Sequence, residues 1–80
     1  MNLDEATRKR ITELAKEKKI SLTALCLNAV LTPSTVFDFM KGRTKTLSSF
    51  TVKKICYGAG ITLSEFYNRD YFNDFDEVVQ

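Results

Sequence analysis

The 80-residue chain has no histidine, one proline, three glycines and two cysteines. Histidine is the commonest metal ligand and general base in proteins, and the sequence offers no nucleophile-plus-base pair, glycine-rich phosphate loop or metal-ligand spacing in its place. Cys26 and Cys56 fit neither a disulfide framework nor a zinc site, and both fall at apolar positions of a helical repeat, so we expect buried, reduced thiols. The sequence therefore predicts a protein without enzymatic activity, cofactor or metal.

Long hydrophobic runs are also missing. No segment approaches the roughly 20 apolar residues of a membrane-spanning helix, and the N-terminus lacks the apolar run and cleavage site of a secretory signal. We therefore expect no contact with a membrane and a cytoplasmic location. The length allows one folded unit and leaves no room for a second, ligand-sensing domain, so no small-molecule ligand is expected.

The charged residues are unevenly distributed, although the net charge is only +2. Residues 1–60 contain eleven lysines and arginines against five acids, a balance of +6, whereas residues 61–80 contain one against five, a balance of −4. A basic surface attracts phosphate and an acidic segment does not. Because basic residues on helices are most often simply hydrated, this distribution alone is weak support for nucleic-acid binding.

Apolar residues recur at spacings of three and four almost throughout, which predicts an all-α, compact domain of five helices. The first helix is expected to begin after Asn2, with Glu5 completing a capping box, and to end near Lys19. Three later starts share a hydroxyl N-cap between two hydrophobic residues that fix the entry angle. These triplets are Ile20, Ser21 and Leu25; Leu31, Thr32 and Val36; and Ile61, Thr62 and Phe66.

The second and third helices, expected over 22–29 and 33–41, are separated only by residues 30–32. Two helices joined by so short a turn and sharing one core form a helix-turn-helix unit. Gly42 is expected to adopt the left-handed conformation that ends the third helix. The fourth helix is expected to start after Ser48 or Ser49 and to end at Gly60, and the fifth to carry Leu63, Phe66 and Tyr67. The core residues expected from these helices are Ile11, Leu14, Ala15, Val36, Phe39, Met40, Val52, Ile55, Cys56 and Ala59.

The third helix has an apolar stripe and a polar edge. The polar edge consists of Ser34, Asp38 and Lys41, and the short side chains Ser34 and Thr35 allow close approach to a large surface such as the major groove. The following loop, residues 42–46, carries two cations and two hydroxyls, which suit phosphate oxygens. Phe37 lies beside this edge, and two interpretations stay open: packing against a neighbouring helix, or contact with a thymine methyl group.

Several segments carry a family resemblance that covers about two thirds of the chain. Residues 20–26 (ISLTALC), 32–36 (TPSTV), 39–43 (FMKGR), 51–56 (TVKKIC) and 60–66 (GITLSEF) occur in the order of the second to fifth helices of one family. The chain resembles the lambda-repressor and Cro-like DNA-binding domains, also called the xenobiotic-response-element type of helix-turn-helix.

The resemblance implies a fold and a binding surface for double-stranded DNA. It implies base contacts from Pro33, Ser34 and Asp38, and phosphate contacts around Ser21, Leu22, Lys41, Arg43 and Lys45. The predicted DNA-binding set also includes Thr32, Thr35 and Phe37. Family analogy and the symmetry of operators further imply a homodimer, with the fifth helix and the tail as the expected interface.

The chain departs from the family pattern in three ways. Leu22 stands where many members have a glutamine that touches phosphate. Val30 occupies a turn position that is usually glycine, so that either the turn differs or its backbone is strained. Pro33, Ser34 and Asp38 lack the Gln, Asn or Arg that reads purines through two hydrogen bonds, and Asp38 can accept from cytosine but repels phosphate. Specificity is then expected to rest on DNA shape, or on a few contacts from Ser34, Thr35 and Asp38 doubled by the two half-sites of a dimer.

The sequence therefore predicts a DNA-binding domain over residues 1–70 and an acidic, partly apolar tail over residues 71–80. The predicted function is sequence-specific DNA binding by a small transcriptional regulator of the repressor or Cro type. The alternative is a protein-interaction module, such as an anti-repressor or regulatory subunit, that keeps the fold without binding DNA. For the tail, docking on the domain, pairing of two subunits and free movement all stay open.

Overall fold

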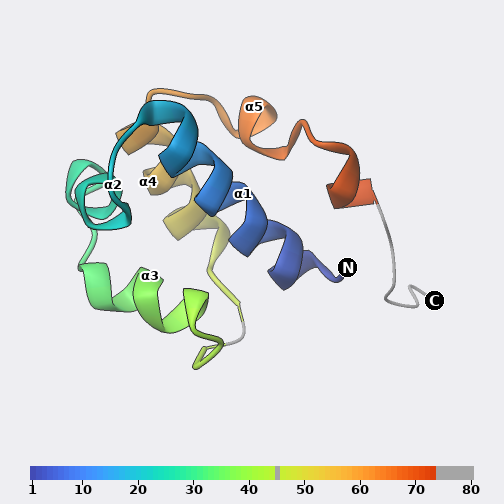
Figure 1. The fold of residues 1–80 in the computed structure, drawn as a ribbon, viewed down its shortest axis with the longest axis horizontal. Helices are drawn as coiled ribbons and strands as arrows, with labels where there is room; N and C mark the ends of the chain where they lie inside the picture. Colours follow the sequence, from blue (N-terminus) through green and yellow to red (C-terminus); the bar gives the residue numbers. More distant parts are fainter. Residues whose placement is uncertain (45, 74–80) are drawn as a thin grey trace.

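The computed structural model describes residues 1–44 and 46–73, which form helices and no strand (Figure 1). The elements are α1 (Leu3–Lys18), α2 (Leu22–Asn28), α3 (Pro33–Met40), α4 (Ser49–Ala59), α5 (Leu63–Tyr67) and the short 3-10 helix η1 (Asp70–Asn73). The prediction of an all-α domain with five α-helices is confirmed, with α2 and α3 each one residue shorter than expected. Lys45 and residues 74–80, which belong to the predicted phosphate loop and tail, lie outside the described residues.

The helix starts follow the predicted capping residues, with one exception. Asn2 and Thr62 form capping boxes with Glu5 and Glu65, and the Ser21 hydroxyl accepts a hydrogen bond from the Ala24 amide at 3.0 Å. Thr32 holds the N-cap position of α3, but its side chain makes no capping hydrogen bond. In a side-chain cap the Thr32 hydroxyl would accept a hydrogen bond from the Thr35 amide. That amide donates instead to the Thr32 carbonyl, at 3.1 Å.

The ends of α1 to α4 share one hydrogen-bond pattern. Each is followed, within two residues, by a residue with left-handed backbone, with φ of 57° at Lys19, 56° at Val30, 78° at Gly42 and 73° at Gly60. The amide of the next residue donates across the helix end to a carbonyl five residues earlier; the pairs are Ile20–Ala15, Leu31–Cys26, Arg43–Asp38 and Ile61–Cys56. This is the Schellman arrangement, in which glycine is the favoured left-handed residue. Gly42 and Gly60 therefore end their helices as predicted.

One hydrophobic core joins the α-helices. It consists of Ile11, Leu14, Leu25, Cys26, Val36, Phe39, Val52, Ile55, Cys56, Ala59 and Phe66. Most expected core residues are confirmed, but Ala15 and Met40 are only partly buried. Cys26 and Cys56 are free, buried thiols, as predicted, and burial raises the pKa of both.

Two arginines of α1 bind the ends of other helices. The Arg10 side chain is buried, and its guanidinium donates to the carbonyls of Glu65 and Phe66 in α5. Arg8 lies over the Phe39 ring and donates to the Phe39 carbonyl near the end of α3 at 2.8 Å. The three carbonyls lie in the last turns of α3 and α5, so these contacts let α1 fix the positions of α3 and α5.

Residues after α5 continue along α1. The Tyr71 hydroxyl donates to the Glu13 carboxylate, and Arg69 pairs with Glu17 at 3.0 Å. The Phe72 ring lies 4.9 Å from the Tyr67 ring, measured between centroids. The folded body therefore extends to Asn73, past the boundary expected at residue 70, and the first residues of the predicted tail dock on the body. Across residues 1–44 and 46–73, no helix has the length and apolar character that crossing a bilayer requires.

Candidate nucleic-acid interface

α2, the turn at residues 29–32 and α3 form one packed unit at the edge of the molecule. Leu25 and Cys26 of α2 and Val36 and Phe39 of α3 are all buried in the common core. In Figure 1 α3 lies along one side of the molecule and α5 with η1 along the opposite side, with α1 between them. The outer surface of α3 therefore faces away from α5 and η1.

The turn after α2 contains a strained residue. Val30 has a φ of 56° although it is not glycine, and a β-branched residue in this region costs about 1–2 kcal/mol. Of the two alternatives raised by the sequence, the structure has the strained backbone. The Val30 side chain is 77% exposed, so burial within the chain does little to offset this cost.

Replacing Val30 by glycine is expected to raise the free energy of unfolding by about 1 kcal/mol, because glycine adopts this conformation freely and only part of the gain is lost to a more flexible unfolded chain. Val30→Ala is the matched control, since it removes the branched side chain but keeps a Cβ in the left-handed region. Urea unfolding of the three proteins tests this, and a glycine variant no more stable than the wild type would contradict it.

The polar edge of α3 is open to solvent. Ser34, Thr35 and Lys41 are exposed, as are Ser21 at the start of α2 and Thr32 before α3. Pro33, Phe37 and Asp38 are partly buried, and for Phe37 both interpretations of its role stay open. Leu22 is also partly buried and packs against the core, so its position carries a structural contact in place of a polar phosphate ligand.

Arg43 lies beside Asp38. Its Nη1 is 3.6 Å from the Asp38 Oδ1, and its amide donates to the Asp38 carbonyl at 2.8 Å. The guanidinium partly offsets the carboxylate that would repel phosphate, while the Arg43 side chain stays 69% exposed. A surface ion pair of this kind contributes about 0–1 kcal/mol, so Arg43 can exchange it for a phosphate contact at small cost.

The loop after α3 is held at both ends. Its start is held by the two amides, of Arg43 and Thr44, that donate to the Asp38 carbonyl. Its end is held by the Thr46 hydroxyl, which bonds the Asp4 carboxylate of α1 at 3.2 Å. The sequence places the Thr46 hydroxyl among the groups suited to phosphate, but this hydroxyl is bonded within the chain. Arg43 and Thr44 are exposed at the surface.

Sequence reasoning missed the roles of Arg8 and Arg10, which it counted only as part of a basic surface. Their partners are carbonyls 31 and 56 residues away, and no local pattern in the sequence marks such a contact. The described residues contain no group of histidine, cysteine, aspartate and glutamate side chains that could hold a metal ion.

Comparison with protein-family models, curated proteins and solved structures finds no match for this chain.

Proposed function

We propose that the protein binds double-stranded DNA in a sequence-specific manner, with α2, its turn and α3 as a helix-turn-helix and α3 in the major groove. The observation that carries the proposal is the open polar edge of α3, where short side chains adjoin an exposed arginine. Ser34 and Thr35 let the helix backbone approach base edges closely, and Asp38 accepts a hydrogen bond from cytosine. With this activity, the protein would act as a small transcriptional regulator of the repressor or Cro type.

The surrounding groups support phosphate binding on both sides of α3. Lys41 and Arg43 follow the helix, and Lys45 adds a third cation in the sequence. On the other side, the exposed Ser21 hydroxyl at the start of α2 is a polar group of the kind that contacts phosphate. Operators are commonly two-fold symmetric, so the proposal includes a homodimer that reads two half-sites.

Arg43→Ala tests this proposal. It is expected to weaken binding roughly tenfold at low salt for all duplex sequences alike, because a phosphate contact carries no sequence information. The slope of log affinity against log salt concentration should decrease in magnitude by about one. Fluorescence anisotropy with labelled duplexes over a salt series measures both effects.

Lys16→Ala is the matched control, because Lys16 is an exposed cation near the end of α1 and lies outside the proposed interface. We expect its affinity and salt slope to equal those of the wild type. Equal losses in the Lys16 and Arg43 variants would mean that net charge alone attracts DNA, and the proposed interface would then be wrong.

A further inference from the structure

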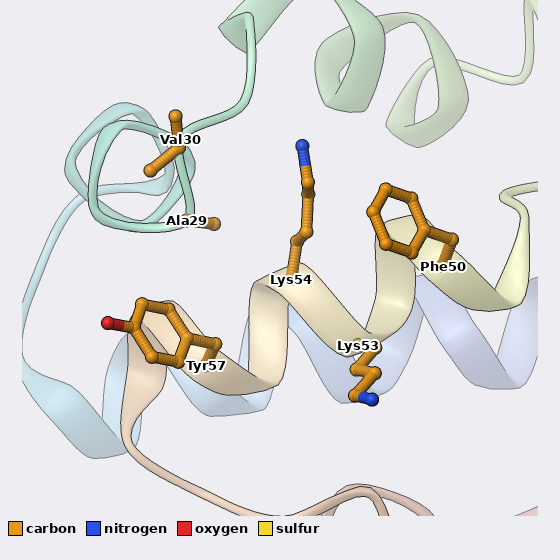
Figure 2. A pocket seen from close by; sticks show the side chains of 6 residues that line it. All are labelled: Ala29, Val30, Phe50, Lys53, Lys54 and Tyr57. Atoms are coloured by element: carbon orange, nitrogen blue, oxygen red, sulfur yellow. The ribbon is translucent and has the colours of Figure 1, made fainter.

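An uncovered groove lies between α4 and the turn that follows α2. It has a volume of about 440 Å³ and is lined by Ala29, Val30, Phe50, Lys53, Lys54 and Tyr57. Figure 2 shows Phe50 and Tyr57 at the two ends of the groove, with Val30 of the turn above α4. The exposed fractions of the apolar side chains are 77% for Val30, 67% for Phe50 and 80% for Tyr57.

These side chains do not stabilise the fold of a single chain. Exposed apolar residues that occur singly need no explanation, but a contiguous patch around a groove is typical of a binding surface. Val30 is separate evidence for a binding surface, because its strained backbone holds an exposed isopropyl group in this groove. The left-handed backbone at Val30 also ends α2 through the Leu31–Cys26 hydrogen bond, a role that glycine fills without strain, so the exposed isopropyl group is the part that the fold itself does not use. The groove is therefore a surface for a partner.

The charges around the groove define the partner's chemistry. In Figure 2 the Lys53 and Lys54 ammonium groups point to opposite sides of α4, and the Lys54 Nζ lies 5.1 Å from the centre of the Phe50 ring. None of the residues that line the groove is acidic. Two such grooves packed on each other would bring four lysines together, which disfavours a direct pairing of α4 with α4. The occupant must be both apolar and acidic.

The end of this chain has that composition. Residues 74–80 read DFDEVVQ, with three acids and three large apolar side chains. The segment follows η1, which Figure 1 places near the opposite end of the long axis from α2. Phe75, which the groove would have to hold, follows Asn73 by two residues, a reach of about 7 Å of extended chain, which is short against the 37 Å length of the molecule. A groove on a second copy is therefore better placed than the groove of the same chain.

We propose that residues 74–80 of a second copy of this chain bind in the groove, and that two copies exchange these segments reciprocally. Phe75 and Val78 would contact the apolar surface between Phe50 and Tyr57, and the acids would pair with Lys53 and Lys54. A reciprocal exchange forms a closed dimer in which each contact occurs twice. This proposal does not depend on DNA binding, and it differs from the interface expected from the sequence, the fifth helix with the tail, because the tail pairs with α4 of the partner.

Charge reversal on the full-length chain tests the proposal. The groove variant carries Lys53→Glu and Lys54→Glu, and the tail variant carries Asp74→Lys, Asp76→Lys and Glu77→Lys. Sedimentation equilibrium without DNA is expected to show a wild-type dimer at about 100 µM and at least tenfold weaker association for each variant alone. Circular dichroism melting checks that the variants are folded.

Mixing the two variants separates exchange from docking within one chain. In a mixed dimer the lysine-bearing tail meets the glutamate-bearing groove and the natural tail meets the natural groove, so both contacts are restored. We therefore expect a heterodimer of near wild-type affinity. Docking within one chain gains nothing from mixing, because each chain keeps its own mismatch.

The control is Lys16→Glu with Lys18→Glu, which reverses two exposed charges in the last turn of α1 and is expected to leave the dimer unchanged. A monomeric wild type at 100 µM, folded variants that dimerise as strongly as the wild type, or a mixture that stays monomeric would each overturn the proposal. These outcomes leave the test of DNA binding by Arg43→Ala unaffected, because that test measures affinity for duplex.

Discussion

Gly58→Ala is expected to lower the free energy of unfolding by about 2–3 kcal/mol, the range of an overpacked contact. Gly58 lies within α4, where α2 approaches closely. A Cβ added there would lie 2.7 Å from the Ala29 nitrogen and 2.9 Å from the Asn28 carbonyl carbon. Both are backbone atoms, so relief requires α2 and α4 to move apart. For a domain of this size the melting temperature should fall by about 10–20 °C.

The sign of this effect distinguishes packing from helix propensity. In an exposed helix, alanine is more stable than glycine by about 1 kcal/mol, so a variant without the close approach would be stabilised. Lys53→Ala, at an exposed position of the same helix, should change stability by no more than about 0.5 kcal/mol. A stabilised Gly58→Ala variant would show that α2 and α4 are not packed as described.

Arg10→Met is expected to lower the free energy of unfolding by about 3 kcal/mol. The Arg10 Nε donates to the Phe66 carbonyl at 2.6 Å, and Nη2 donates to the Glu65 carbonyl at 3.1 Å. Methionine fills similar space but leaves the Phe66 carbonyl without this donor, and a buried unpaired acceptor costs about 1–3 kcal/mol; the Glu65 carbonyl loses a charged donor but keeps the Asn68 amide at 3.4 Å. Arg10→Lys should recover only part of the loss, because an ammonium does not present the forked donors of a guanidinium.

Glu17→Gln shows which partner of Arg10 matters. The Glu17 carboxylate lies 3.4 Å from Arg10 Nη1, but its side chain is 46% exposed, so its loss should cost less than about 1 kcal/mol. Chemical denaturation of the three variants gives the comparison. If Glu17→Gln destabilised the protein as much as Arg10→Met, the ion pairs of Glu17 with Arg10 and Arg69, and not the carbonyl contacts, would hold α5 to α1.

The helix bounds could be predicted from sequence because their signals are local. Asn2, Ser21 and Thr62 bond amides three residues away, and Gly42 and Gly60 end helices through their own backbone freedom. Thr32 is the exception, because its carbonyl and not its hydroxyl accepts the hydrogen bond from the Thr35 amide. Such competition between two acceptors of the same residue leaves no mark in the sequence.

The contacts that position the candidate interface could not be predicted in the same way. The Cβ clash at Gly58, the carbonyls bound by Arg8 and Arg10, and the groove beside Val30 all depend on how separate helices approach each other. For the interface itself, the exposed edge at Ser34 and Thr35 followed from helical periodicity. The pairing of Arg43 with Asp38 did not follow from periodicity, because it forms only when the loop after α3 folds back along that helix.

Selection of bound duplexes from a random-sequence pool tests the central claim most directly. The full-length protein at low salt is expected to enrich one short motif, arranged as two half-sites, and Ser34→Arg should change the enriched bases near the α3 edge. Recovery of an unchanged pool, or retention of no duplex at all, would contradict DNA binding by this surface.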